Sequence, residues 1–237
     1  MLNKNRKIPV RHFFTLSSTL DTAKKWKNKG KEVIIVAKKQ TRGRGREGRS
    51  FSSQAGGLYL GWLHFPQDMK AKDGFWLVAR GAVAVCKTLE DYGLSPTIKW
   101  PNDVLLGGKK ICGILTENTL SGDRIQSTVV GIGLNVNNRL EDSLLPIATS
   151  LKEALNKKVS LREVERRLFS YLATSFNRVD YYSRLGSLGE VEILENGTCY
   201  SAIAEGIDEQ GLLIVSVSGE RQKKSAAEIS LRKVEKR

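Results

Sequence analysis

The 237-residue sequence has few of the residues that build disulfide or zinc scaffolds. Its three cysteines, Cys86, Cys112 and Cys199, are odd in number, lie far apart and form no CxxC pair. A disulfide framework or a structural zinc site is therefore not indicated. The only histidines, His12 and His64, fall in expected strands, where a packed or surface histidine is commoner than a metal ligand. We expect no metal site built from protein ligands alone.

Long apolar runs and acidic residues are also scarce. No stretch of 18 apolar residues occurs, and no apolar segment of the signal-peptide kind follows the basic N-terminus. Export and membrane spanning are not expected, and the cytoplasm is the expected location. Asp and Glu total 25 against 39 Lys and Arg, a net charge of +14. This excess suits a polyanionic partner, a phosphate-bearing substrate or an acidic protein surface, and charge alone does not choose among them.

The sequence does contain one segment dense in glycine and arginine. Residues 43–51 read GRGREGRSF, and we call them the basic glycine loop. Glycine permits positive φ and close backbone approach, so successive N–H groups can face an oxyanion. Arg44, Arg46 and Arg49 add planar donors that bind phosphate in a bidentate manner. A solvated basic turn is the alternative, which the basic residues just upstream favour. We interpret the segment as a phosphate-binding loop.

The glycines of this loop formally match a dinucleotide fingerprint, GxGxxG, and Asp68 falls near the distance expected for a ribose-binding acid. We reject that interpretation because the fingerprint needs a helix to begin at the glycines. Residues 49–57 have no helical periodicity and lead into an expected strand. A Walker loop also fails, since no Gly-Lys-Ser/Thr follows at the required offset. A phosphate-wrapping loop that joins two strands remains.

Periodicity and turn signals predict an α+β fold with a change of texture near residue 188. Strands are expected at residues 12–16, 33–37, 57–65, 97–100, 103–106, 110–116 and 125–136. Helices are expected from Ser18 towards Gly30, over residues 73–92, and from a capping box at Ser160 and Glu163 to Val179. Short β runs at 191–194, 200–205, 212–217 and 228–231 then indicate a small barrel. We therefore expect one domain over 1–186 and another over 187–237.

A second set of charged residues surrounds an expected hairpin. Residues 99–103 read KWPND, and Lys110 and Glu117 follow on the next strand. Phosphoryl or nucleotidyl transfer needs cations for the developing charge and a carboxylate for Mg²⁺. Exposed ion pairs are the alternative for any one of these residues taken alone.

Four motifs in order resemble biotin protein ligases, from about Phe13 to the C-terminus. They are GRGREGR at 43–49, KWPND at 99–103, GIL at 113–115 and GIGLNVN at 131–137. The resemblance implies a mixed, largely antiparallel sheet flanked by helices, as in class II aminoacyl-tRNA synthetases, followed by an SH3-like barrel. It also implies a biotin–[acetyl-CoA carboxylase] ligase that uses ATP and Mg²⁺ to make biotinyl-5′-AMP and pyrophosphate. The biotinyl group would then pass to a lysine of a biotin carboxyl carrier protein.

The resemblance also implies which residues form the site. Biotin would contact Ser18, Thr19, Gln40, Gly43, Arg44, Tyr59, Gly113, Leu115 and Gly131. ATP and the adenylate would contact Arg46, Arg49, Phe51, Lys99, Asn102, Asp103, Lys110 and Asn135. The catalytic residues would be Lys110 and Arg46, and Mg²⁺ would arrive with ATP near Asp103.

Three residues depart from the usual family pattern. Leu20 replaces Asn or Gln after Ser-Thr, Phe51 replaces a frequent Trp, and Arg42 replaces a small residue. The catalytic motifs begin within the first twenty residues, so we expect no winged-helix domain and no DNA partner. A homodimer is the default expectation because relatives often dimerise through the sheet.

Two other functions remain open. A related ligase acting on lipoate would share the fold and the adenylation step, although the basic glycine loop and the C-terminal barrel favour biotin. An RNA- or single-strand-binding module would use the same loop and the net charge, although few aromatic residues accompany the loop for base stacking. Whichever holds, we expect the loop to be mobile without ligand, because ordering nine residues costs on the order of ten kcal/mol and Glu47 is the only counter-charge in the loop.

Overall fold

The computed structural model describes residues 8–226 and 229–233, which form two sheets and five α-helices. The strands are β1 Val10–Leu16, β2 Val33–Gln40, β3 Leu58–His64, β4 Thr97–Lys99, β5 Asp103–Leu106, β6 Lys109–Ser121, β7 Arg124–Leu134, β8 Gly189–Glu195, β9 Thr198–Ile207, β10 Leu213–Val217, β11 Glu220–Lys224 and β12 Ile229–Lys233. The helices are α1 Thr19–Lys24, α2 Phe75–Glu90, α3 Leu151–Leu155, α4 Leu161–Ala173 and α5 Arg178–Tyr182.

The large sheet has seven strands in the order β1-β2-β3-β7-β6-β5-β4. Only β1 and β2 pair in parallel, and each of the other neighbours pairs antiparallel. The prediction of a mixed, largely antiparallel sheet is therefore confirmed. The expected hairpin is formed by β5 and β6, and Gly107 and Gly108 make its turn, with φ of +57° and +80°. Such values favour glycine because a Cβ would meet the backbone.

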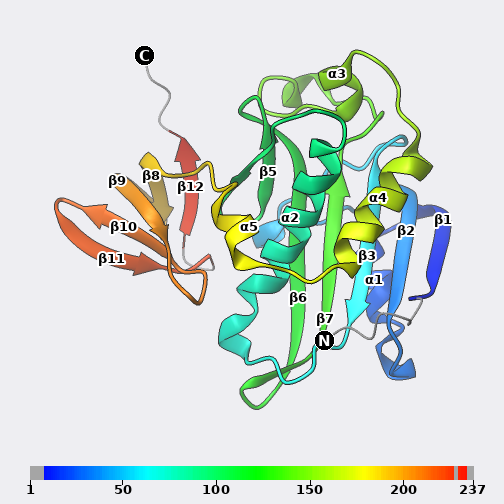
Figure 1. Cartoon of the computed structure of the whole chain (residues 1–237), viewed down its shortest axis with the longest axis horizontal. Coiled ribbons are helices and arrows are strands. Elements are labelled where there is room, and N and C mark those ends of the chain that lie inside the picture. The colour runs from blue at the N-terminus through cyan, green and yellow to red at the C-terminus, as the bar shows by residue number, and fades with distance from the viewer. Residues whose placement is uncertain (1–7, 227–228, 234–237) are drawn as a thin grey trace.

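The two faces of this sheet have different covers. Leu60 on β3 and Ile132 on β7 belong to the main core, which α2 and α4 also join. The alternate residues face the side of α1, where Leu20 and Ile35 form a smaller core. Figure 1 shows α2 and α4 on the near face of the sheet and α1 behind it. No helix in the described part of the chain is long and apolar enough to cross a membrane.

The helix expected from residue 161 to Val179 was wrong, because the chain forms α4 and α5 instead. Thr174 leaves the helix with φ −76° and ψ 161°, and its hydroxyl donates to the carbonyl of Tyr171. Asn177 then caps α5 by accepting from the N–H of Val179. These short polar side chains compete for backbone groups, which is why they end and begin helices.

The capping box expected at Ser160 is only half formed. The Ser160 hydroxyl accepts from the N–H of Glu163, but the Glu163 carboxylate binds Arg166 and Arg167. Arg166 and Arg167 lie three and four residues after Glu163 on the helix, so their side chains compete for its carboxylate. A complete capping box forms instead at Ser150 and Glu153, where α3 begins.

The C-terminal residues form a separate antiparallel sheet of five strands in the order β11-β10-β9-β8-β12. The expected change of texture near residue 188 therefore corresponds to a second sheet, which stands beside the large sheet in Figure 1. In the described residues, β11 and β12 are the two edges and do not pair with each other. The structure thus supports an all-β C-terminal unit but not a closed barrel.

Candidate functional site

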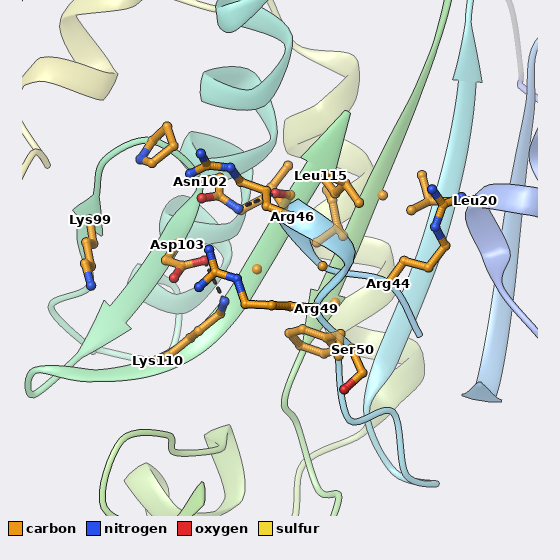
Figure 2. A pocket seen from close by; sticks show the side chains of 18 of the residues that line it. Leu20, Arg44, Arg46, Arg49, Ser50, Lys99, Asn102, Asp103, Lys110 and Leu115 are labelled. Carbon is orange, nitrogen blue, oxygen red and sulfur yellow. Dashed lines mark hydrogen bonds and ion pairs between the residues drawn. The ribbon is translucent and has the colours of Figure 1, made fainter. Parts of the chain in front are cut away.

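A cavity of about 190 Å³ lies beneath the basic glycine loop, on the face of the large sheet that also carries α1. Most of the predicted site residues line it: Thr19, Gln40, Arg44, Arg46, Arg49, Phe51, Lys99, Asn102, Asp103, Lys110, Gly113, Leu115 and Gly131. The loop, β5 and β6 bring these residues together although more than 80 positions separate some of them in sequence. Figure 2 shows the labelled side chains around this space.

Glycines on neighbouring strands form the floor of the pocket. Gly113 on β6 pairs directly with Gly133 on β7. A Cβ added to Gly133 would lie 2.7 Å from the ring of Phe51, and a Cβ added to Gly131 would lie 2.9 Å from Leu20. Such approaches are too short for carbon atoms, so Phe51 and Leu20 fit only because the floor has no side chains there. This explains the glycines at 131 and 133.

The basic glycine loop is a folded cover rather than an extended turn. The N–H of Gly45 donates to the carbonyl of Arg49 at 2.7 Å, and the N–H of Phe51 donates to the carbonyl of Gly43 at 2.9 Å. Arg44 and Ser50 form an isolated antiparallel bridge. The two ends of the loop are therefore tied together across its base, and the arginines project from a compact unit.

One end of the pocket lies at Arg44. Its Nη1 contacts the Asp21 carboxylate of α1 at 2.7 Å, and its Nη2 contacts the Glu117 carboxylate of β6 at 2.7 Å. Glu117 also forms an ion pair with Lys24. Two cations and two carboxylates thus balance one another beside the apolar side chains of Leu20 and Leu115. This end of the pocket carries no net charge.

A series of hydrogen bonds links Thr19, Gln40 and Ser53 at the Arg44 end of the pocket. The backbone N–H and the hydroxyl of Thr19 both donate to Gln40 Oε1, at 2.8 Å and 3.0 Å. The amide Nε2 of Gln40 then donates to the hydroxyl of Ser53 at 2.8 Å. Because the amide of Gln40 is held at both ends, the hydroxyl and carboxamide groups of this pair are fixed at the pocket wall.

The other end of the pocket is rich in cations. Lys110 Nζ lies 2.7 Å from Asp103 Oδ1, a contact drawn in Figure 2, and 5.8 Å from the centre of the Phe51 ring. Asn102 donates from Nδ2 to the carbonyl of Ile114 at 2.8 Å. Arg46, Arg49 and Lys99 complete this end. Among the residues that the structure describes, these four cations outnumber Asp103 and Glu47, the carboxylates that contact them, so this end suits an anion.

Arg46 is bound to the C-terminal sheet. Its Nη2 donates to the carbonyl of Ala226 and, at 3.4 Å, to that of Ile229. Burial lowers the pKa of Arg46 from its ordinary value, against the opposing effect of Glu47. Arginine remains charged under such a shift. A partly buried cation therefore faces the cavity from the loop.

These contacts correct one premise of the sequence analysis. We expected Glu47 to be the only counter-charge for the loop, but Arg44 has Asp21 and Glu117 as partners, and Arg46 has backbone carbonyls. All of these partners come from outside the loop. The cost of ordering the loop is therefore offset partly by contacts that exist without ligand.

Four predicted site residues do not line the cavity. Ser18 accepts from the N–H of Asp21 and so caps α1. Gly43 is buried at the base of the loop, where a Cβ would lie 2.3 Å from the Phe51 carbonyl oxygen. Tyr59 donates to the carbonyl of Gln54 at 2.7 Å, and burial raises the pKa of its phenol.

Asn135 is the fourth of these residues. Its Nδ2 donates to the carbonyl of Thr149 at 3.1 Å, and its Oδ1 accepts from Asn138 at 3.1 Å. It is only 5% exposed. The amide is thus committed to neighbours in the fold and supports the strand end beside the pocket.

The pocket also contains residues that the sequence analysis did not assign. Leu231 of β12 lines it, and so does Trp100. Asp21 holds Arg44, although only its place at the start of a helix was predicted. The KWPND motif contained a signal for Trp100, whereas no local pattern links Leu231 or Asp21 to the loop. Their roles depend on contacts between distant parts of the chain.

No group of three His, Cys, Asp or Glu side chains that could hold a metal occurs within residues 8–226 and 229–233. Among the described residues that line the pocket, Asp103 is the single carboxylate. The arrangement as a whole can place a neutral ring at the Arg44 end and an anionic group among Arg46, Arg49 and Lys110. It can also exclude water beneath the folded loop.

Comparison with known proteins agrees with these features. Residues 13–135 match the Biotin/lipoate A/B protein ligase family, and residues 190–232 match the Biotin protein ligase C terminal domain. The bifunctional ligase/repressor BirA of Bacillus subtilis is 36% identical over 236 residues, which cover 91% of this chain and 72% of that protein. The biotin–[acetyl-CoA-carboxylase] ligase of Paracoccus denitrificans is 31% identical over 217 residues, or 82% of this chain and 88% of that protein.

A solved structure resembles the whole described architecture. Biotin protein ligase from Aquifex aeolicus, in complex with biotin and ATP, superimposes with a TM-score of 0.75 at 29% identity. The match covers 94% of this chain and 98% of that one. Both the family match and the identity to curated relatives extend over most of the chain. This chain is therefore a member of the biotin/lipoate A/B protein ligase family.

Proposed function

We propose that this protein is a biotin–protein ligase that adenylates biotin with ATP and then biotinylates a lysine of a biotin carboxyl carrier protein. The observation that carries the proposal is the polarity of one pocket, which is neutral at Arg44 and cationic at Lys110. Biotin has the matching polarity, with an uncharged ureido ring at one end and a carboxylate at the other.

In the first step the biotin carboxylate attacks the α-phosphate of ATP, and pyrophosphate leaves. The carboxylate is already ionised at neutral pH, so the step needs no general base. It needs alignment, together with cations that offset repulsion between two anions. Lys110 is the proposed cation at the reacting atoms, and Asp103 orients it through their 2.7 Å contact. Arg46 and Arg49 bind phosphate oxygens from the loop.

In the second step the amine of the acceptor lysine attacks the carbonyl of biotinyl-5′-AMP. A C–N bond forms, AMP leaves with the electrons of the C–O bond, and the ammonium proton goes to solvent. The mixed anhydride must not meet water before the acceptor arrives. The basic glycine loop is the proposed cover, because its base is tied by the Gly45–Arg49 and Gly43–Phe51 hydrogen bonds.

Magnesium enters as part of the nucleotide substrate. Mg²⁺ commonly binds one or two carboxylates together with substrate phosphates and water. Asp103, the carboxylate among the described lining residues, fits that requirement at the cationic end of the pocket. We therefore propose Asp103 as the protein group nearest to a metal ion brought in by ATP.

Each remaining site residue has a proposed role. Thr19 and Gln40 bind the ureido group, and Gly113, Leu115 and Gly131 form the walls around the ring. Lys99, Asn102 and Phe51 contact the nucleotide. Ser18, Gly43, Tyr59 and Asn135 act by holding pocket residues in place, since their polar groups or backbone are bound within the fold.

The C-terminal match favours biotin over lipoate as the substrate. Residues 190–232 match the domain that is named for biotin protein ligases.

We propose that residues 1–186 form the catalytic domain and that residues 187–237 form an SH3-like domain. We also propose a homodimer. Phe14, on the edge strand β1, is 74% exposed and is a candidate contact. Light scattering of the purified protein tests the dimer.

The test of the proposed function is ATP–pyrophosphate exchange with biotin, with lipoate and with neither. Exchange that depends on biotin and is near background with lipoate supports the proposal. Exchange that lipoate supports equally well contradicts the assignment of substrate. No exchange with either acid, in protein shown to be folded, contradicts adenylation itself and returns attention to nucleic-acid binding, which a filter-binding assay with single-stranded RNA would measure.

A further inference from the structure

The turn between β9 and β10, residues 208–211, contacts the large-sheet unit behind the pocket. The Asp208 carboxylate accepts from the N–H groups of Gln210 and Leu212, at 2.9 Å and 3.0 Å, so the turn is internally braced. Gly211 has φ +82°, and a Cβ there would lie 2.0 Å from the ring of Phe75. Only glycine permits this approach. The turn is therefore a braced extension of the C-terminal sheet that packs against Phe75 of α2.

Two buried indoles bind this turn. Trp76 Nε1 donates to the carbonyl of Glu209 at 2.9 Å, and Trp100 Nε1 donates to the carbonyl of Gly211 at 3.0 Å. Their side chains are 4% and 1% exposed. The two bonds are alike in donor, acceptor and length. The bond of Trp100 is fully buried and that of Trp76 only partly, and Arg178 Nη1 also donates to the Glu209 carbonyl at 3.2 Å. The bonds also differ in place, because Trp76 lies in α2 and Trp100 lies in the pocket lining.

Backbone hydrogen bonds to residues 184–187 also hold the segment around Trp100. The Trp100 N–H donates to the hydroxyl of Ser187 at 3.0 Å. The Ile98 N–H donates to the carbonyl of Arg184 at 2.7 Å, and the Gly186 N–H donates to the carbonyl of Ile98 at 2.8 Å. Residues 184–187 thus lie along β4 like an additional strand, and they lead directly into β8.

The front of the same segment faces the pocket. Asn102 donates to the carbonyl of Ile114, and Asp103 contacts Lys110 at 2.7 Å. Trp100 is therefore separated from Asp103 by only two residues, and it is the point at which the C-terminal sheet contacts this part of the site.

We propose that the turn at residues 208–211 positions residues 99–103 for adenylation, with Trp100 as a positioning residue. The inference rests on the proposed function for its kinetic consequence. Its physical basis is the small tolerance of in-line attack, since a misplacement of about 1 Å costs up to roughly a hundredfold in rate. Loss of the indole also leaves the Gly211 carbonyl without this donor and opens space where the larger ring packed, so residues 99–103 can shift.

The test compares Trp100→Phe with Trp76→Phe. Each variant loses one indole hydrogen bond to the same turn, so a merely structural role predicts equal effects. We expect Trp100→Phe to lower kcat for biotin-dependent pyrophosphate exchange by roughly tenfold to a hundredfold. The KM for biotin should change by less than about twofold, because the ring binds at the opposite end of the pocket. Trp76→Phe should leave kcat within about twofold of wild type, with a comparable fall in melting temperature.

Hydrogen–deuterium exchange supplies a readout that does not require activity. We expect amides of residues 97–106 to exchange at least about tenfold faster in Trp100→Phe, and at the wild-type rate in Trp76→Phe. If Trp100→Phe does not fold, Ser187→Ala is the substitute variant. It removes only the hydroxyl that accepts from the Trp100 N–H, and we expect a smaller increase in the exchange of the same amides. Equal protection of residues 97–106 in both variants, or equal losses of kcat, would overturn the inference. If the wild-type protein shows no biotin-dependent pyrophosphate exchange, the proposed function fails. The hydrogen–deuterium exchange of residues 97–106 still decides the positioning role of Trp100.

Discussion

Arg44 and Arg46 are two residues apart in the same loop, yet their surroundings are opposite. Arg44 is held by the carboxylates of Asp21 and Glu117, so its charge is neutralised before any ligand arrives. Arg46 is bound to carbonyl groups of the C-terminal sheet and contacts Glu47, which it shares with Arg49. It lies at the end of the pocket where cations outnumber carboxylates among the described residues. The comparison teaches that one loop can supply both a neutral wall and an anion site, because distant elements decide the net charge at each end.

The largest expected effect is at Lys110. Lys110→Ala should slow biotinyl-adenylate formation by roughly a hundredfold to a thousandfold, because it removes the cation at the developing charge. Biotin affinity should change little, because the ring lies at the Arg44 end. Rapid-quench measurement of a single turnover gives the rate, and calorimetry gives the affinity. The matched control is Lys109→Ala, whose ammonium donates to the carbonyl of Leu145. Adenylation at the wild-type rate in Lys110→Ala would refute the assigned role.

The next largest effect is at Arg46. Arg46→Gly removes the cation that binds phosphate from the loop and also removes the contact to Ala226. We expect the adenylate to escape, so that bulk albumin becomes biotinylated roughly tenfold or more faster than with wild type. Streptavidin blots over time measure the labelling. Arg42→Gly, at an exposed position of the same segment, is the control. Albumin labelling no faster than that of the control means that Arg46 does not retain the intermediate.

Glu117→Gln should weaken biotin binding and leave the rate of adenylation unchanged, which is the reverse of the result expected for Lys110→Ala. It removes one of the two carboxylates that hold Arg44, and hydrogen bonds to charged groups contribute about 1.5 to 3 kcal/mol. The Arg44 side chain is 42% exposed and solvent screens the pair, so we expect the lower end of this range, or roughly a tenfold rise in the dissociation constant for biotin. Asp68→Asn, in an exposed ion pair with Arg124, is the charge-matched control. An unchanged affinity would show that the Arg44 contacts do not shape the ring end.

The smallest expected effect concerns the cover itself. Arg49 has a side chain that is 62% exposed, so trypsin should reach it in the free protein. Biotin with MgATP should slow cleavage after Arg49 several-fold, since phosphate adds partners for the loop to those it already has. Cleavage after the exposed Lys157 is the internal control. Equal rates at Arg49 with and without saturating ligand, in active protein, would mean that the loop is not the cover.

The sequence allowed most of the fold and much of the site to be predicted, for a physical reason. Residues that bind phosphate and residues that turn the chain leave local patterns, as in the GRGREGR and KWPND segments. The apolar runs at 57–65 and 125–136 likewise predicted the strands β3 and β7. The break after Ala173 was missed because Leu168, Leu172 and Phe176 keep helical spacing across it, whereas Thr174 and Asn177 decide the backbone.

Contacts between distant segments could not be predicted. Nothing near Asp21 indicates that it meets Arg44, and nothing near Leu231 indicates a pocket. Nothing near Gly211 indicates that its carbonyl accepts from Trp100. The same limit explains why Asn135 was expected at the nucleotide although its amide binds Thr149 and Asn138. A motif identifies which residue types gather, but the direction of each side chain depends on the packing of the whole unit.

The central claim is that the two ends of the pocket have separate tasks, binding of the ring and reaction of the carboxylate. The most direct test is the rate of single-turnover adenylation as a function of biotin concentration, measured side by side for Glu117→Gln and Lys110→Ala. The account predicts that Glu117→Gln raises the half-saturating biotin concentration and keeps the maximal rate. It predicts that Lys110→Ala lowers the maximal rate and keeps the half-saturating concentration. If both variants change the same parameter, the ends of the pocket do not divide the work and the account is contradicted.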